Sequence, residues 1–185
     1  MRRLIPSQSA VVVVDVQERL AAAMPASRMT DVVRGAKILV ESARLLGASV
    51  FATVQYPKGL GPMIEPIEAV LSAAGVVPLE KSHFSAADAP AFMDALKSSG
   101  ARDVVVIGME THVCVYQTVR DLAASGYNVH VAADGVCSRR DDVREIGLGL
   151  ATRSGAVVTT SETVVLDWLR DSAAAEFKAI SRLIR

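Results

Sequence analysis

An aspartate, a lysine and a cysteine each come soon after an apolar run of this chain. Asp15 directly follows the run AVVVV, Lys81 comes two residues after VVPL, and Cys114 lies a few residues beyond VVVI. A carboxylate near a thiol can take its proton and later pass it to a leaving group, and a nearby ammonium stabilises both charges. Ligands of open parallel sheets bind beyond the carboxyl ends of the strands. If the runs are neighbouring strands, the three side chains form a candidate catalytic group.

Cys114 is expected near the start of a helix. Thr111 is suited to be the N-cap, which would make Cys114 the third helical residue. The helix dipole there favours the thiolate and lowers cysteine pKa values below about 8.5, and the free N–H groups of the first turn could receive an oxyanion. Ordinary interpretations stay open: Cys114 as a small buried hydrophobe, Asp15 as a helix cap, and Lys81 as a solvated charge.

The three histidines offer a rival arrangement, in which a Cys/His pair does the chemistry. His112 lies only two residues from Cys114 on the same helix, so the two do not face each other. His130 falls in the middle of an expected strand, and His83 alone could reach the site from a loop. Cys137 follows the fifth strand and is expected to pack locally. The Asp15, Lys81 and Cys114 group is therefore preferred.

Composition and motifs exclude several classes of function. The 20 basic and 20 acidic residues cancel, so no long-range field attracts nucleic acid or an anionic membrane surface. The apolar runs are far shorter than the roughly 20 residues that span a bilayer, and no secretory signal precedes them. Two cysteines suggest reduced thiols and a cytoplasmic setting. The sequence lacks metal-ligand spacing, GxGxxG and a Walker lysine loop, so neither a metal nor a cofactor is expected.

Apolar runs alternate with amphipathic segments along the whole chain. Strands are expected at 10–15, 49–54, 76–79, 103–107, 127–132 and 156–159, and helices at 30–46, from 85, at 112–124, at 141–153 and towards the C-terminus. The segment 56–66, rich in glycine and proline, is the one long irregular insertion and a candidate pocket wall. Such alternation predicts right-handed βαβ crossovers. The fold class is therefore α/β, a single domain over residues 1–185 built as a three-layer doubly wound sandwich with a parallel sheet of about six strands.

Three segments resemble the signatures of the isochorismatase-like cysteine hydrolase superfamily. They are AVVVVDVQ, EKSHFS and GMETHVCVYQT, and their order and spacing both match. The resemblance implies the sheet order 3-2-1-4-5-6 and a catalytic triad of Asp15, Lys81 and Cys114. It also implies a cis peptide between Met109 and Glu110, with the N–H groups of Glu110 and Cys114 as the oxyanion hole.

The resemblance further implies a hydrolase that cleaves a small amide, carbamoyl or related C–N bond through a covalent intermediate on Cys114. Gln17, Gln55, Tyr56, His83 and Phe84 are the expected substrate-binding residues. Nicotinamidases of the superfamily bind a metal after the second strand, where this chain has Gln55, Tyr56 and Pro57.

The segment TVQYPKGLG is closer to the isochorismatase-domain-containing and YcaC-like branch. A homo-oligomer acting on a small molecule is expected. Two alternatives stay open: a non-catalytic scaffold that keeps the fold, and a redox sensor in which Cys137 resolves an oxidised Cys114.

Overall fold

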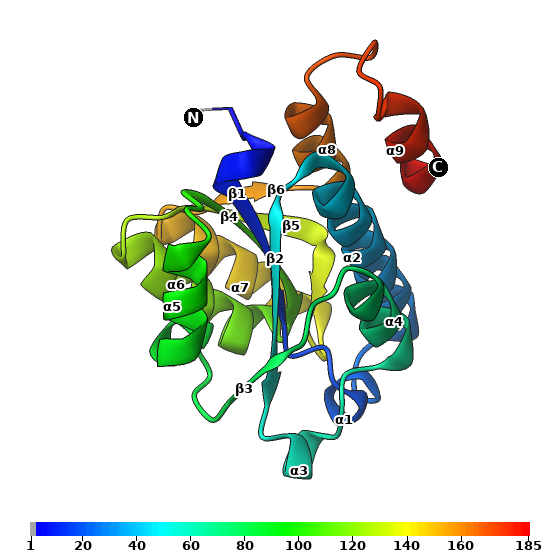
Figure 1. The fold of residues 1–185 in the computed structure, drawn as a ribbon. Helices are drawn as coiled ribbons and strands as arrows, with labels where there is room; N and C mark the ends of the chain where they lie inside the picture. Colours follow the sequence, from blue (N-terminus) through cyan, green and yellow to red (C-terminus); the bar gives the residue numbers. More distant parts are fainter. Residues whose placement is uncertain (1–2) are drawn as a thin grey trace.

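A six-stranded parallel sheet forms the middle layer of the computed structural model, which describes residues 3–185 (Figure 1). Its order is β3-β2-β1-β4-β5-β6, and all neighbouring strands are parallel, so the predicted sheet is confirmed. The strands are β1 (Ser9–Val14), β2 (Ser49–Gln55), β3 (Leu79–Lys81), β4 (Asp103–Met109), β5 (Asn128–Cys137) and β6 (Val157–Thr159). Because β1 and β4 are central, their carboxyl ends lie at the middle of one edge of the sheet.

Strand β1 explains why both faces of the sheet are covered. All six of its residues are buried, as expected for a run of β-branched side chains between two helix layers. Successive side chains point to opposite faces, so Val11 and Val13 join one apolar core while Ala10, Val12 and Val14 join the other. One strand thus ties the two cores together and fixes the position of Asp15 just beyond it.

Helices cover the sheet on both faces, which confirms the three-layer fold class (Figure 1). In Figure 1, α2, α4, α8 and α9 lie on one side and α5, α6 and α7 on the other. The helices are α1 (Glu18–Ala21), α2 (Ala26–Leu46), α3 (Pro57–Leu60), α4 (Glu65–Ala73), α5 (Pro90–Ser98), α6 (Tyr116–Ala124), α7 (Asp141–Arg153), α8 (Ser161–Leu169) and α9 (Phe177–Ile184). Short turns precede β1, α5 and α6 at η1 (Pro6–Gln8), η2 (Ala86–Asp88) and η3 (Thr111–Val115). Over residues 3–185 no helix has the length and apolar character needed to cross a bilayer.

The segment 56–66 is more ordered than expected. It contains the short helix α3, and α4 begins within it at Glu65. Pro57 and Pro66 lie in the first turns of these two helices, where proline is tolerated because its missing N–H has no helical partner anyway. Pro57 and Pro66 therefore mark the starts of two helices rather than an irregular loop.

Two strands differ from the expected bounds. β3 is shifted towards Lys81 and pairs only with the end of β2. β5 runs on to Cys137 instead of stopping at residue 132, because its pairing with β4 shifts register between Val106 and Gly108 and takes up extra residues there. This irregularity lies beside the turn that carries Cys114.

Candidate active site

Asp15 and Lys81 form a buried ion pair at the carboxyl edge of the sheet. The Lys81 Nζ lies 2.6 Å from Asp15 Oδ2, and neither side chain is exposed to solvent. Thr53, on the strand between them, donates its hydroxyl to the other carboxylate oxygen at 2.8 Å. The aspartate adopts a positive φ of 52°, which turns the chain at the end of β1. The side chain of Asp15 is therefore fixed from two sides.

The Lys81 ammonium is fully used within the protein. Besides Asp15, it donates to the backbone oxygens of His83 and Phe84, both at 3.0 Å, and lies 3.2 Å from Gln55 Oε1. These contacts hold the loop after β3 against the end of β2. The solvated-charge interpretation of Lys81 is wrong, since its side chain is completely buried.

Cys114 completes the cluster. Its thiol donates to Gln55 Oε1 at 3.3 Å, and the nearby Asp15 carboxylate acts on it electrostatically. The backbone of Glu110 lowers the pKa of this thiol, as a nearby N–H group does by favouring the thiolate. The sheet and the helix that follows β4 thus bring Asp15, Lys81, Gln55 and Cys114 into one connected network.

The acidity of this thiol differs from what its place near a helix start predicts. Burial raises the pKa of Cys114 to about 12, and the Asp15 carboxylate adds to the rise, while Lys81 opposes it. Burial likewise raises the pKa of Asp15 against the opposing effect of Lys81. Cys114 is therefore a neutral thiol beside a carboxylate of increased basicity, not a preformed thiolate.

The start of the helix explains part of this difference. Residues 111–115 form a turn of π-helix before α6, the N-cap is Glu110, and Cys114 is the fourth helical residue. Thr111 is not the cap: its hydroxyl is buried and has no hydrogen-bond partner among residues 3–185. The wider turn keeps Cys114 at 5% exposure, where burial outweighs the helix dipole.

Two glycines let the backbone close in around Cys114. A Cβ at Gly108 would lie 2.0 Å from the Val14 oxygen, so β4 can approach β1 closely only because this residue has no side chain. A Cβ at Gly147 of α7 would lie 2.8 Å from the backbone of Thr111, so α7 packs directly on the π turn. The peptide between Met109 and Glu110 is cis, as the resemblance predicts.

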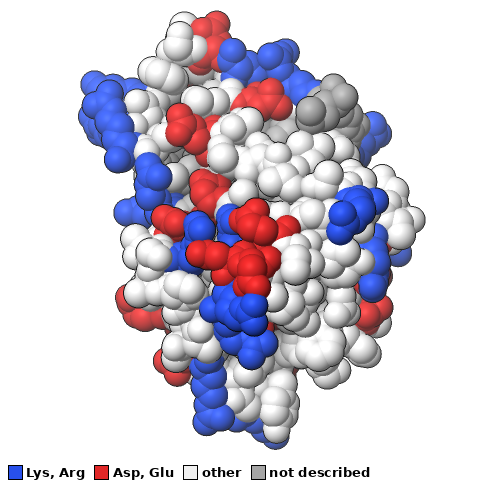
Figure 2. All heavy atoms as spheres, turned by 180° about the vertical axis from the view of Figure 1, so that it is seen from behind, with Lys and Arg blue, Asp and Glu red and all other residues white. Residues whose placement is uncertain are grey.

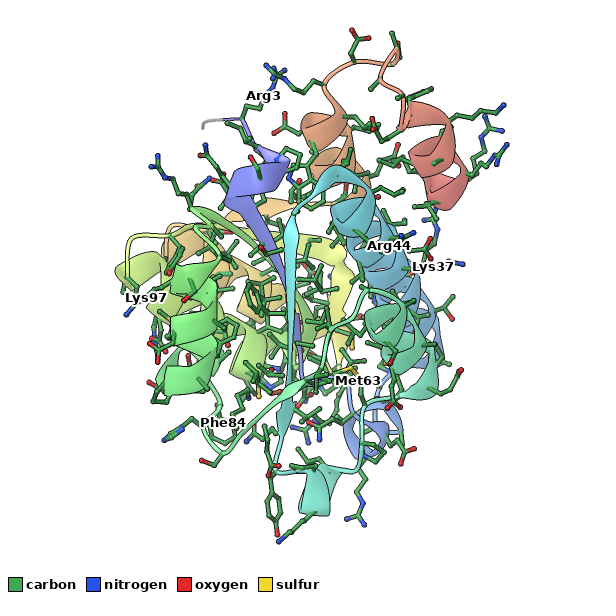
Figure 3. All side chains as sticks on the ribbon, viewed as in Figure 1. Arg3, Lys37, Arg44, Met63, Phe84 and Lys97 are labelled. Atoms are coloured by element: carbon green, nitrogen blue, oxygen red, sulfur yellow. The ribbon has the colours of Figure 1, made fainter. Side chains whose placement is uncertain are left out.

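A pocket of about 310 Å³ opens beside the thiol. It is lined by Leu20, Gln55, Tyr56, Leu60, Phe84, Glu110, Val113 and Cys114. Figure 3 shows Phe84 in the loop that leads from β3 towards α5, near the carboxyl edge of the sheet. Three of the predicted binding residues, Gln55, Tyr56 and Phe84, therefore line the pocket, and the segment 56–66 supplies part of its wall.

The other two predicted binding residues have different places. Gln17 is completely buried, and its amide bonds the backbone N–H and C=O of Gln55 and the oxygen of Gly61 at 2.7 to 3.0 Å. It holds the pocket wall and is not part of the lining. His83 contributes its backbone oxygen to Lys81, while its side chain is exposed and absent from the pocket lining.

The rival Cys/His pair does not form among residues 3–185. The ring of His112 bonds the Ser138 hydroxyl at 3.0 Å, and His130 contacts Asn128 in β5. Cys137 is buried against Met29, with the two sulfurs 4.0 Å apart, as expected for local packing. Within the same described range, no cluster of three or more His, Cys, Asp or Glu side chains is arranged to hold a metal.

The structure thus combines a doubly wound parallel sheet with a buried thiol and an Asp–Lys pair at its carboxyl edge. The chain belongs to the isochorismatase family, since the model of the isochorismatase domain matches residues 9–163.

Individual relatives agree with the family. Isochorismatase domain-containing protein 1 of Salmo salar is 36% identical over 182 residues, which cover 98% of this chain and 62% of that protein. The chain thus spans less than two thirds of that relative's length. A Caenorhabditis elegans structure described as MAR1 ribonuclease has a TM-score of 0.91 at 34% identity, covering 99% of this chain and 92% of that one. The YcaC gene product of Escherichia coli, an octameric hydrolase of unknown specificity, shares the fold with a TM-score of 0.87 at 21% identity, covering 100% and 90%.

Proposed function

We propose that the protein hydrolyses a small amide, carbamoyl or related C–N bond through a covalent intermediate on Cys114. The observation that carries the proposal is the network of Asp15, Lys81, Gln55 and Cys114 at the base of a pocket of about 310 Å³. The network supports the proposal because a thiol, a carboxylate and a fixed cation lie beside a space that admits a small molecule.

In the first half of the proposed reaction, Cys114 Sγ attacks the substrate carbon and the thiol proton passes to Asp15. The substrate oxygen gains negative charge, which the backbone N–H groups of Glu110 and Cys114 stabilise as an oxyanion hole. The backbone of Glu110 already lowers the pKa of the Cys114 thiol. Asp15 then gives its proton to the leaving nitrogen, the C–N bond breaks, and ammonia or an amine departs from the thioester.

In the second half, water attacks the thioester after giving a proton to Asp15. The C–S bond breaks, the acid product leaves, and the proton returns to Cys114, so the thiol is regenerated. Lys81 remains protonated throughout and holds the Asp15 carboxylate in place through the 2.6 Å contact. Its catalytic effect in this scheme is electrostatic.

The raised thiol pKa supports proton transfer during attack rather than before it. With a pKa of about 12, Cys114 is protonated at neutral pH, so its base must lie near it, and the Asp15 charge acts directly on this thiol. The same property weighs against the redox sensor, because oxidation proceeds through the thiolate. The pKa of Cys137 is also raised to about 12 by burial.

RNA cleavage is a second candidate because the C. elegans neighbour is described as a ribonuclease and two Leishmania neighbours as putative ribonucleases. Figure 2 shows one face of the molecule, on which acidic and basic side chains are interspersed rather than gathered by sign. An acidic residue, Glu110, lines the pocket, and Lys81 is already bound within the protein. These features favour a small neutral substrate over a polyanion.

The proposal is tested by trapping the intermediate. The protein and its Cys114→Ser variant are incubated with a panel of small aliphatic and carbamoyl amides, and with an RNA oligonucleotide. We expect ammonia release together with an acyl mass on Cys114, and neither in the variant. A folded protein that gives no acyl adduct and no ammonia with any amide would favour the scaffold alternative.

We also propose that the protein forms a homo-oligomer and acts in the cytoplasm. The E. coli YcaC neighbour is an octamer, and light scattering after size exclusion would give the number of subunits here. Both cysteines are free thiols, in keeping with a reducing compartment.

A further inference from the structure

The pocket has an acidic residue in its lining but no basic one. Glu110 lines its wall, and the charge of the Asp15 carboxylate acts on Cys114. The nearest buried cation, Lys81, lies within hydrogen-bond distance of four protein oxygens. No lining residue of this pocket is a lysine or an arginine. A substrate carboxylate would therefore face carboxylates without a free cation.

Within residues 3–185, only one of the two Glu110 carboxylate oxygens accepts hydrogen bonds from the protein. The backbone N–H and the Nε of Arg139 both donate to Oε2, at 3.1 and 3.0 Å. No protein group within residues 3–185 donates to Oε1, and the Glu110 side chain is 9% exposed. Because the residue lines the pocket, this oxygen is available to a ligand. Oε1 is open to solvent, so a ligand that brings a donor can replace water there.

The rest of the wall is apolar. Leu20, Leu60 and Val113 line it, and the rings of Tyr56 and Phe84 stand at its edge with 60% and 52% exposure. A pocket of about 310 Å³ is at the lower end of the size range of ligand sites. It fits a small organic group rather than a nucleotide or a peptide.

From these observations we infer that Glu110 selects the substrate: an uncharged small molecule whose N–H donates to Glu110 Oε1 and whose apolar remainder packs on Leu20, Leu60 and Val113. This inference rests on the proposed function, whose substrate class it narrows to primary amides and their uncharged relatives. Substrates that carry a carboxylate are rejected by repulsion in a pocket of low dielectric.

The test uses two thiol reagents of similar size, iodoacetamide and iodoacetate, which differ in charge and in the N–H donor. Each forms an S–C bond at Cys114 and releases iodide, while the thiol proton passes to Asp15 or buffer. Rates are measured at one pH by mass spectrometry of the Cys114 peptide. Each amide-to-acetate ratio is divided by that of N-acetylcysteine. We expect a preference for iodoacetamide of at least about tenfold, as one unscreened repulsion can supply.

Three variants separate selection by Glu110 from other causes. Glu110→Gln keeps an acceptor oxygen for Arg139 but removes the charge, and should bring the normalised ratio close to one. Arg139→Gln removes the cation bound to Glu110 and should increase the preference. Arg140→Gln is the matched control, because Arg140 is an exposed neighbour that pairs with Asp142 instead; it should leave the ratio unchanged. Circular dichroism checks that each variant is folded.

The outcomes distinguish the inference from the proposed function. A wild-type ratio equal to that of N-acetylcysteine, or an equal response of Arg139→Gln and Arg140→Gln, overturns the inference while Cys114 keeps its nucleophilic role. Failure of Cys114 to react with either reagent overturns both. Selective alkylation without turnover of any amide overturns the proposed hydrolase and leaves the charge selection in place.

Discussion

The reactivity of Cys114 should depend steeply on pH. Its pKa is raised to about 12 by burial and by Asp15, so the thiolate fraction in the free protein rises about tenfold with each pH unit up to that value. We expect the iodoacetamide rate at Cys114 to rise across pH 7 to 10 without the plateau that a free thiol with a pKa of about 8.5 shows. A plateau near neutral pH would mean that a preformed thiolate exists.

Lys81 should make this thiol more acidic than it would otherwise be. Its charge lowers the pKa of Cys114, so Lys81→Met is expected to slow alkylation at a given pH. The variant also leaves Asp15 buried without its partner, which costs about 3 to 5 kcal/mol of stability. The rate is therefore compared with that of Thr53→Val, which also removes a hydrogen bond to Asp15 but no charge. Equal alkylation rates in the two variants would contradict the electrostatic role.

At the residue scale, the sequence predicted the cluster but not its chemistry in detail. Asp15, Lys81 and Cys114 could be found because each follows an apolar run, and parallel strands end at one edge. The pocket role of Glu110 could not, because it depends on Arg139, 29 residues further along the chain. The raised pKa of Cys114 could not be predicted from the sequence either, because the burial that raises it is a property of the assembled fold.

At the element scale, the packing of α7 on the π turn should control the position of Cys114. Gly147→Ala would place a Cβ 2.8 Å from the backbone of Thr111, and overpacking of this kind costs about 1 to 3 kcal/mol. We expect a lower Tm and an altered alkylation rate at Cys114. Gly149→Ala on the same helix is the control, because its nearest atom is 3.9 Å away at the end of the Arg153 side chain. That change should stabilise the helix by up to about 1 kcal/mol.

The pocket wall should depend on Gln17 in a similar way. Its amide holds the backbone of Gln55 and the oxygen of Gly61, so Gln17→Ala leaves buried backbone groups without partners, at about 1 to 3 kcal/mol. Urea unfolding is expected to show this loss. Gln17→Glu is the matched comparison, since its carboxylate keeps the acceptor for the Gln55 N–H but loses both donors. Unchanged stability in both variants would mean that the wall is held by other contacts.

The elements themselves were largely predictable, and the exceptions have physical reasons. Long periodic segments such as α7 were found with their bounds, because helix periodicity is a local property. α4 was missed because Pro66 made the start of this helix look like part of a loop. Pro66 sits in the first turn, where proline fits. The π turn at 111–115 leaves no local signal: it follows from contacts that α7 makes with it across the fold.

At the scale of the whole molecule, the two cores should unfold together. β1 contributes alternate residues to both of them, so neither can be lost while the other remains intact. We expect a single cooperative transition in urea, with coincident near- and far-ultraviolet circular dichroism curves. Two separated transitions would contradict the prediction of one domain over residues 1–185.

The long sequence separation between Asp15 and Lys81 also has a consequence for folding. They lie 66 residues apart, and Cys114 and Gln55 are separated by 59. No local segment can form this cluster, so it appears only after the chain has closed several large loops, which is slow compared with helix formation. Chemical labelling at Cys114 during refolding would therefore report the arrival of the native topology, later than any signal from the helices.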